Sequence, residues 1–307
     1  MPLGIKPTVD FAFKKIFGST ENVRTLIGLL NAILELPAPI TDVEILNPFN
    51  YQEFVGDKQI ILDIRARDST GRWLNIEMQV SVVNGLPERL VYYACSLYVD
   101  QLGSGSGYVA LQPAISICLL SDILFRDTDV AHHRFRLYDG EAKRELGDMV
   151  EVHMVELPKY NLLEATITAS SKIEQWAFFL LHADRYDPDR LRALLPGVEF
   201  DQAITVIEAI SQKTEDRTMY DQREKALRDQ QWLLEGARQE GLERGLEKGL
   251  EKGREEARGV LVDTVATLQR IAEVTVTDAE ELKKLAIDDL SRLCTELQSR
   301  LRTRGSS

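Results

Sequence analysis

The fold is decided by the stretch from residue 63 to residue 79, which reads DIRARDSTGRWLNIEMQ. Apolar and polar residues alternate with a period of two on both sides of a turn, a pattern typical of two β-strands. One face would carry Ile60, Leu62, Ile64 and Ala66, then Leu74, Ile76, Met78 and Val80. Asn75, Glu77 and Gln79 would share the opposite face. We therefore predict a hairpin folded near Thr70, with strands at about 58–67 and 72–80.

Two acidic residues of this hairpin come together when it closes. Folding near Thr70 places Asp63 almost opposite Glu77. Facing carboxylates destabilise a strand pair by roughly 0.2–1 kcal/mol. A divalent cation between the two carboxylates would make their arrangement favourable, because Mg²⁺ is held by one or two carboxylates with phosphate and water. The pair indicates a candidate site for phosphodiester hydrolysis.

A simpler interpretation stands beside this one. An antiparallel hairpin with one solvent-exposed face gives the same alternation, and exposed faces carry charges. The pattern alone favours that interpretation. Two details weaken it: Asp and Asn are depleted in strands, and the side chains of Glu77 and Gln79 leave the same face.

Asp63 followed by Glu77-x-Gln79 resembles the active-site signature of the PD-(D/E)XK nuclease superfamily, in particular its bacterial branch of recombination-promoting nucleases and transposases (Rpn-like). Residues 7–18 (PTVDFAFKKIFG) resemble the opening helix of that branch. Residues 89–93 (RLVYY) and 153–159 (HMVELPK) resemble a later helix and the last core strand. The usual Lys of the signature is Gln79 here, as in the Rpn-like branch, and Gln cannot supply positive charge.

The resemblance implies an α/β fold, with a restriction-endonuclease-like PD-(D/E)XK core, a mixed central sheet flanked by helices, and an α-helical C-terminal region. It implies a Mg²⁺-dependent DNA endonuclease linked to recombination or transposition, with Mn²⁺ as a substitute. Asp63 and Glu77 would bind the metal, with the Met78 carbonyl as a third ligand, and Gln79 would position the attacking water. Asp10 would hold the metal or a nearby water. Alternatively, it is a capping or surface acidic residue near the start of the first helix.

DNA is the expected partner, although the formal net charge is −12. Local cations matter more than the total, and Lys14, Arg65 and Arg89 are the candidate nucleic-acid contacts. For Arg89 the alternative is a salt bridge on a helix face. A second hypothesis is a catalytically weak or inactive DNA-binding or assembly protein with a degenerate nuclease core. Gln79 and the acidity favour it, and the intact Asp63 and Glu77 oppose it.

No stretch predicts a membrane span or a signal peptide, so we expect a cytoplasmic protein without a membrane partner. Cys95 and Cys118 lie in apolar runs and are predicted as small core residues. His132 and His133 are adjacent on a predicted strand and point to opposite faces, which favours a structural role over a shared metal.

The chain divides by pattern into a nuclease-like core (1–160), a helical extension (161–215) and a charged helical arm (216–307). In the core we predict helices at 8–17, 20–36 and 87–102, and further strands near 40–46, 114–120, 133–138 and 150–157. The extension turns helical at about 165, is broken around 184–201 and resumes as a helix at 201–212.

The arm contains a four-residue repeat, GLERGLEKGLEKGREEA, at residues 241–257. Each Gly inside a helix costs roughly 0.5–1 kcal/mol relative to Ala, more than the i,i+3 charge pairs return. A Gly stripe on which a second helix packs predicts a homo-oligomer. A solvated linker helix and repeat expansion by slippage remain open alternatives. Residues 260–302 have amphipathic spacing and predict a helical hairpin or a coiled coil.

Overall fold

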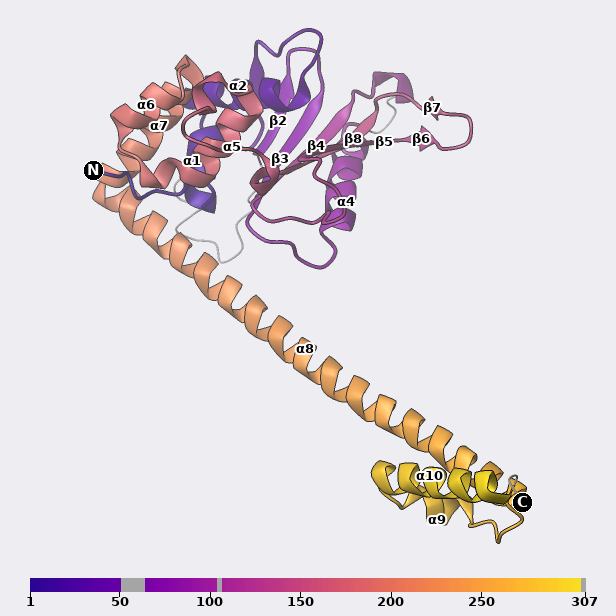
Figure 1. Ribbon diagram of the computed structural model, residues 1–307. Coiled ribbons are helices and arrows are strands. Elements are labelled where there is room, and N and C mark those ends of the chain that lie inside the picture. The colour runs from indigo at the N-terminus through magenta and orange to yellow at the C-terminus, as the bar shows by residue number, and fades with distance from the viewer. Residues whose placement is uncertain (51–63, 104–106, 305–307) are drawn as a thin grey trace. The chain divides into compact units, whose positions relative to one another are not determined.

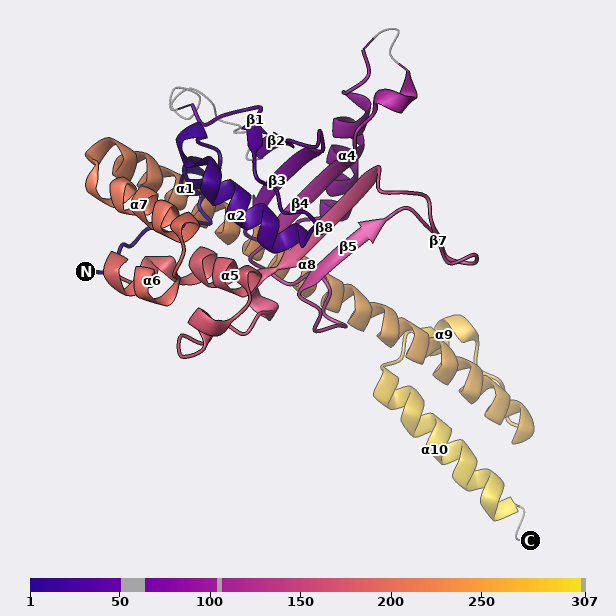
Figure 2. The ribbon, with the colours of Figure 1, turned by 90° about the horizontal axis from the view of Figure 1, so that it is seen from above.

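A computed structural model of the chain describes residues 1–50, 64–103 and 107–304. Its centre is a mixed sheet with the strand order β1-β2-β3-β4-β8-β5, seen from above in Figure 2. These strands are β1 (Val43–Ile45), β2 (Ile64–Asp68), β3 (Trp73–Gln79), β4 (Ala114–Leu120), β8 (Val150–Glu156) and β5 (His132–Arg136). β3, β4 and β8 run parallel, and the other neighbours are antiparallel.

The predicted hairpin is formed by β2 and β3. Ile64 pairs with Ile76 and Arg67 with Trp73, so the turn lies around Thr70 as expected. Asp68 closes it, because its Oδ1 accepts hydrogen bonds from the backbone N of Thr70 at 2.9 Å and of Arg72 at 3.0 Å.

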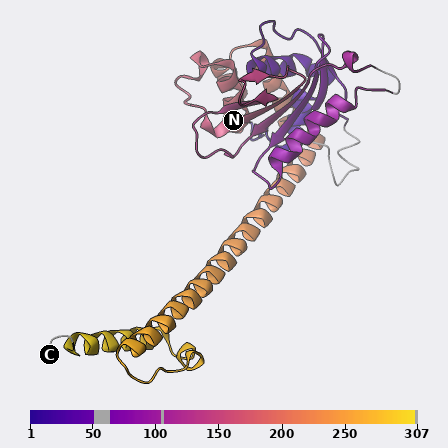
Figure 3. The ribbon, with the colours of Figure 1, turned by 90° about the vertical axis from the view of Figure 1, so that its right-hand side faces the viewer.

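Helices cover both faces of the sheet (Figure 1). One face packs on a core shared with α1 (Asp10–Phe17), α2 (Val23–Leu34), α5 (Lys172–His182) and α7 (Val198–Gln212). Trp176 lies in that core, with its ring centroid 4.2 Å from that of Phe200. The other face packs on α4 (Leu86–Val99), the helix that lies along the sheet in Figure 3. Its Leu86, Leu90 and Ala94 share a buried apolar cluster with Cys118, Leu120, Val152 and Met154. This arrangement confirms the predicted α/β fold with a mixed sheet.

Three local predictions were wrong. The supposed break at 184–201 contains α6 (Pro188–Leu194), because Asp187 caps it and Pro188 occupies its first turn. α7 begins at Val198 rather than near residue 201. Cys95 is exposed, since it faces away from the sheet on α4, whereas Cys118 is fully buried as predicted. A short hairpin of β6 (Tyr138–Asp139) and β7 (Arg144–Glu145) adds to the strands expected.

The chain separates into two compact units, Met1–Asp229 and Gln230–Ser307, and helix α8 (Thr214–Ile271) belongs to both. In the first unit the start of α8 packs on the main core. The Tyr220 hydroxyl accepts from the backbone N of Lys6 at 2.9 Å, and Lys15 pairs with Asp216 at 2.6 Å. The predicted boundaries at residues 160 and 215 stay predictions.

In the second unit, the end of α8 packs with α9 (Ala279–Lys283) and α10 (Ile287–Arg304). Their shared apolar cluster includes Val262, Val265, Leu282, Leu290 and Leu297. This is the helical hairpin that the amphipathic spacing predicted. Within the described part of the chain, no helix is both long enough and apolar enough to cross a bilayer.

Candidate active site

Glu77 lies near the end of β3 and is buried, with 4% of its surface exposed. β3 lies inside the sheet, between β2 and β4, and its two faces are covered by the main core and by α4. Asn75, on the same face, is 1% exposed. The interpretation of this hairpin as one with a solvent-exposed polar face is therefore wrong. Burying an ionised carboxylate is costly unless charges or hydrogen bonds compensate, so its partners decide its role.

Two described side chains donate hydrogen bonds to Oε1 of Glu77. One is the amide Nε2 of Gln79, two residues along the strand. The other is Nη2 of Arg89 at 2.6 Å. Arg89 comes from the first turn of α4, where Gly85 adopts a φ of +78° and its carbonyl accepts from the backbone N of Arg89. The predicted residues Glu77, Gln79 and Arg89 thus form one cluster.

The three side chains of this cluster differ in their exposure to solvent, and Glu77 is the most buried. The side chain of Arg89 is 34% exposed, that of Glu77 is 5% exposed, and Gln79 is half-buried. Gln79 donates through its amide nitrogen, so its amide oxygen remains for a water or a cation. Glu77 is the fixed inner carboxylate, and Gln79 and Arg89 are the members that can meet a ligand from solvent.

Asp63, the second predicted metal ligand, lies outside the described residues. β2 is described from Ile64, which pairs with Ile76, the neighbour of Glu77. The facing arrangement of Asp63 and Glu77 stays a prediction.

Comparison with family models gives a match over residues 7–237 to the PD-(D/E)XK nuclease family transposases. That span holds the whole sheet and every predicted site residue. The chain belongs to this family. No curated protein and no solved structure matched the chain. The family match ends within α8, before the repeat that begins at Gly241.

Asp10, predicted from the family resemblance as a metal ligand, is the first residue of α1. Its Oδ1 accepts from the backbone N of Phe11 at 2.7 Å. Burial raises the pKa of this carboxyl, and the hydrogen bond from Phe11 and the charge of Arg223 oppose the rise. The charge of Arg223, a residue of α8, thus acts on Asp10. Its part in metal binding stays a prediction.

The two other predicted cations, Lys14 and Arg65, lie toward the sheet. Lys14 on α1 is only 4% exposed, and a side chain added at Gly18 would meet both Lys14 and Ile64. Arg65 on β2 is half-buried and pairs in register with Asn75, so it shares the face of Glu77. Their contacts with nucleic acid stay predictions.

The donor atoms around Glu77 suit a hard cation. A carboxylate, an amide oxygen and backbone carbonyls are the oxygen ligands that Mg²⁺ and Mn²⁺ accept. Within the described ranges, no three His, Cys, Asp or Glu side chains gather closely enough to hold a metal alone. A cation here would thus take Glu77 as its described carboxylate and depend on further ligands.

The motif HMVELPK at residues 153–159, at the end of β8, has a structural role. Glu156 is fully buried and accepts from the backbone N of Leu124 at 2.5 Å and of Phe125 at 3.0 Å. Lys159 pairs with Glu156 at 2.7 Å and donates to the carbonyls of Phe125 and Val130. Burial alone would raise the pKa of Glu156, but these bonds lower it. The motif fixes the loop before β5 to the end of β8.

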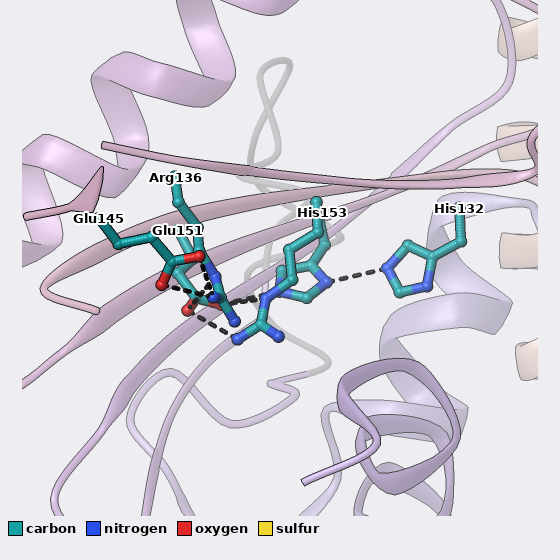
Figure 4. A network of polar contacts seen from close by, with 6 residues as sticks. His132, Arg136, Glu145, Glu151 and His153 are labelled. Carbon is teal, nitrogen blue, oxygen red and sulfur yellow. Dashed lines mark hydrogen bonds and ion pairs between the residues drawn. The ribbon is translucent and has the colours of Figure 1, made fainter. Parts of the chain in front are cut away.

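The adjacent histidines have separate partners. His133 approaches Glu156 at 3.4 Å, whereas His132 bonds His153 at 2.9 Å in the network of Figure 4. His153 in turn contacts Glu151 at 3.1 Å. Burial, then the charges of His153, His133 and Arg134, lower the pKa of His132 to about 4.

Glu151 is the anionic centre of that network. Arg134 binds it with two hydrogen bonds of 2.9 and 2.7 Å, and Arg136 lies 3.0 Å away. Burial would raise the pKa of Glu151, but the bonds from His153 and Arg134 and the charge of Arg136 lower it to about 2. The sequence predicts a structural role for the His pair but does not single out Glu151, because its cross-strand partners depend on the β5–β8 register.

Proposed function

We propose that the protein is a metal-dependent DNA endonuclease that hydrolyses phosphodiester bonds in recombination or transposition. The observation that carries this proposal is the buried carboxylate of Glu77 on a central strand, bonded by Gln79 and Arg89. Membership of a nuclease family transposase group supports it independently. An acid beneath a helix, with an amide and a guanidinium beside it, suits a phosphate bound together with a cation.

In this proposal Asp63 and Glu77 hold Mg²⁺, which Mn²⁺ can replace, with the Met78 carbonyl and Asp10 as further candidate ligands. The chemistry that the cation supplies when bound is Lewis acidity toward a water and the scissile phosphate. Gln79 orients the attacking water through its amide. Arg89, with a third of its side chain exposed, is placed to turn from Glu77 to a phosphate oxygen.

Local charge supports DNA as the partner despite the net charge of −12. Arg65 shares the face of Glu77, and Arg89 bonds to Glu77 with a third of its side chain exposed. Lys14, which is 4% exposed, would have to turn outward to meet a phosphate. Few phosphate contacts give weak binding with a shallow salt dependence, because the slope scales with the number of phosphates neutralised. We therefore expect brief contact with DNA rather than tight coating of it. The cytoplasmic location stays a prediction.

The second candidate is a catalytically weak or inactive DNA-binding or assembly protein. Gln79 favours it, because Gln replaces the cationic residue usual at that position and cannot stabilise a transition state by charge. Gln79→Lys separates the two candidates. A working endonuclease tolerates the change or gains rate, whereas a degenerate core stays inactive.

We also propose self-association through the arm. Gly241, Gly245, Gly249 and Gly253 have nothing within 4 Å of an added Cβ among the described residues. Beside them Leu242, Leu246 and Leu250 are 68%, 64% and 57% exposed. A helix with costly glycines and exposed leucines at the same spacing fits a second copy packed on it.

The test of the endonuclease is conversion of supercoiled plasmid by the purified full chain. We expect nicking with Mg²⁺ or Mn²⁺ and none after addition of EDTA. Glu77→Gln keeps the shape of the side chain and should remove the activity. Glu44→Gln, in an exposed pair with Arg67, is the matched control and should leave it unchanged. Nicking that persists in EDTA or in Glu77→Gln would contradict the proposal.

A further inference from the structure

Two polar side chains beside Glu77 have no hydrogen-bond partner within the described part of the chain. They are Asn75, through both Nδ2 and Oδ1, and Ser116, through Oγ. Asn75 is 1% exposed and Ser116 is fully buried. Buried polar groups are nearly always hydrogen-bonded, because an unpaired one destabilises the fold. Two such residues at neighbouring positions therefore need an explanation.

Their position links them to Glu77. Asn75 precedes Glu77 by two residues, and Gln79 follows by two, so the three side chains share one face of β3. The carboxylate thus stands between two amides along the strand. Ser116 is the register partner of Asn75 on β4, and Arg65 is its partner on β2. Residues two apart on a strand are separated by roughly 6.6 Å, which Gln79 already spans to reach Glu77.

The side-chain amides of Gln79 and Asn75 have different surroundings. Gln79 and Arg89 both bond to Oε1 of Glu77, and both reach solvent, where a phosphate would approach. The side chain of Asn75 lies deeper and makes no hydrogen bond to a described residue. Its register partners on this face are Arg65 and Ser116, and the apolar cluster of α4, β4 and β8 covers the same face of the sheet. An amide at this position can donate to a carboxylate, which a Leu side chain could not do, so we connect the polarity of Asn75 with Glu77, two residues along the strand.

We propose that Asn75 is a positioning residue for Glu77. Its Nδ2 donates to the Glu77 carboxylate when Gln79 and Arg89 turn toward a substrate phosphate. Ser116 donates its hydroxyl proton to Oδ1 of Asn75 and so holds the amide with Nδ2 toward Glu77. This inference rests on the proposed function, because it explains how Glu77 keeps its orientation while its outer partners serve the reaction.

The first experiment does not depend on nuclease activity. The side-chain amide signals of Asn75 are followed by NMR in the full chain and assigned by their loss in Asn75→Leu. In Gln79→Ala the Glu77 carboxylate loses one donor, so the Asn75 amide protons should move downfield and exchange at least about tenfold more slowly. Thr25→Val, which alters a buried hydroxyl on α2, is the control and should leave them in place. Unchanged signals in Gln79→Ala would overturn the proposal.

The second experiment measures the consequence for the site. Asn75→Leu and Ser116→Ala remove unpaired buried groups, so thermal stability should hold or rise. Mn²⁺ affinity by calorimetry should fall about 10- to 100-fold, as expected when a residue that orients a metal ligand is lost. In plasmid cleavage kcat should fall while KM for DNA stays unchanged.

The outcomes distinguish a failure of the Asn75 role from a failure of the proposed function. Stable variants that bind Mn²⁺ and cleave as the wild type does would show that Asn75 is only a buried amide. A wild-type chain that neither binds Mn²⁺ nor nicks plasmid would contradict the proposed function instead. In that case the NMR measurement decides alone whether Asn75 positions Glu77.

Discussion

The chain pairs arginine with a carboxylate in two opposite settings. Arg89 meets Glu77 at 2.6 Å beneath α4, where the carboxylate side chain is 5% exposed. Arg244 meets Glu240 at 2.5 Å in the arm, where both side chains are more than 60% exposed. Exposed pairs contribute about 0.2–1 kcal/mol, whereas a buried carboxylate depends on its partner. The comparison teaches that burial separates the two pairs, because only the buried carboxylate depends on its arginine.

Removal of the predicted second metal ligand should have the largest effect. Asp63→Ala should lower metal-dependent nicking at least about a hundredfold, because Glu77 alone cannot hold the cation. The fold should remain, which circular dichroism checks. Glu240→Ala removes the exposed carboxylate of the comparison and should cleave at the wild-type rate. Equal rates for Asp63→Ala and the wild type would show that the site assignment is wrong.

Stability sharpens the comparison directly. Arg89→Ala leaves Glu77 buried with one donor fewer, so we expect a loss of about 1–3 kcal/mol, reduced from the value for a fully buried pair because Arg89 is partly exposed. Arg244→Ala should change the free energy of unfolding by less than about 0.5 kcal/mol. Urea unfolding measures both. Equal losses would mean that burial does not separate the two pairs.

Low pH should lower the free energy of unfolding of the first unit, Met1–Asp229, through protonation of His132. Its pKa falls from 6.5 to about 4 in the folded chain because it is buried and faces His153. The unfolded chain therefore takes up the proton first, and stability is complete above pH 6.5 and declines toward pH 4. We expect about 1–2 kcal/mol after allowance for solvent screening. His132→Gln should flatten this pH dependence, and an unchanged slope would show that another group carries it.

The arm gives the smallest effect for each residue. Replacing a repeat glycine with Ala should stabilise a lone helix by about 0.5–1 kcal/mol for each position. The four positions are Gly241, Gly245, Gly249 and Gly253. In a close-packed pair the added methyl groups should weaken association instead. Sedimentation of the wild type, the Ala variant and a truncation near residue 215 tells these apart. A wild type that is monomeric at micromolar concentration would leave the repeat as a spacer.

Much of the fold could be predicted from local patterns. The period-two alternation through Ile76 and the apolar run at residues 114–120 depend only on neighbours in sequence, and both form the expected strands. α6 was missed although Asp187 and Pro188 are a helix-start signal, because both residues also mark turns. Cys95 was misplaced because an apolar run in α4 does not show which of its residues face the sheet.

The site was less predictable than the fold. Glu77 and Gln79 could be singled out by their shared face, but burial of that face required the parallel partner β4 and the cover of α4. The bond from Arg89 to Glu77 depends on where α4 begins relative to β3. The unpaired polar atoms of Asn75 and Ser116 become visible only once the register places them together.

Mn²⁺ binding to the full chain tests the central claim most directly, namely that buried Glu77 is a metal ligand. Isothermal titration calorimetry of the wild type, Glu77→Gln and Glu240→Gln compares the buried carboxylate with the exposed one. We expect one site for each chain in the wild type and in Glu240→Gln, and affinity weaker by at least about tenfold in Glu77→Gln. The same affinity in all three proteins would contradict the account.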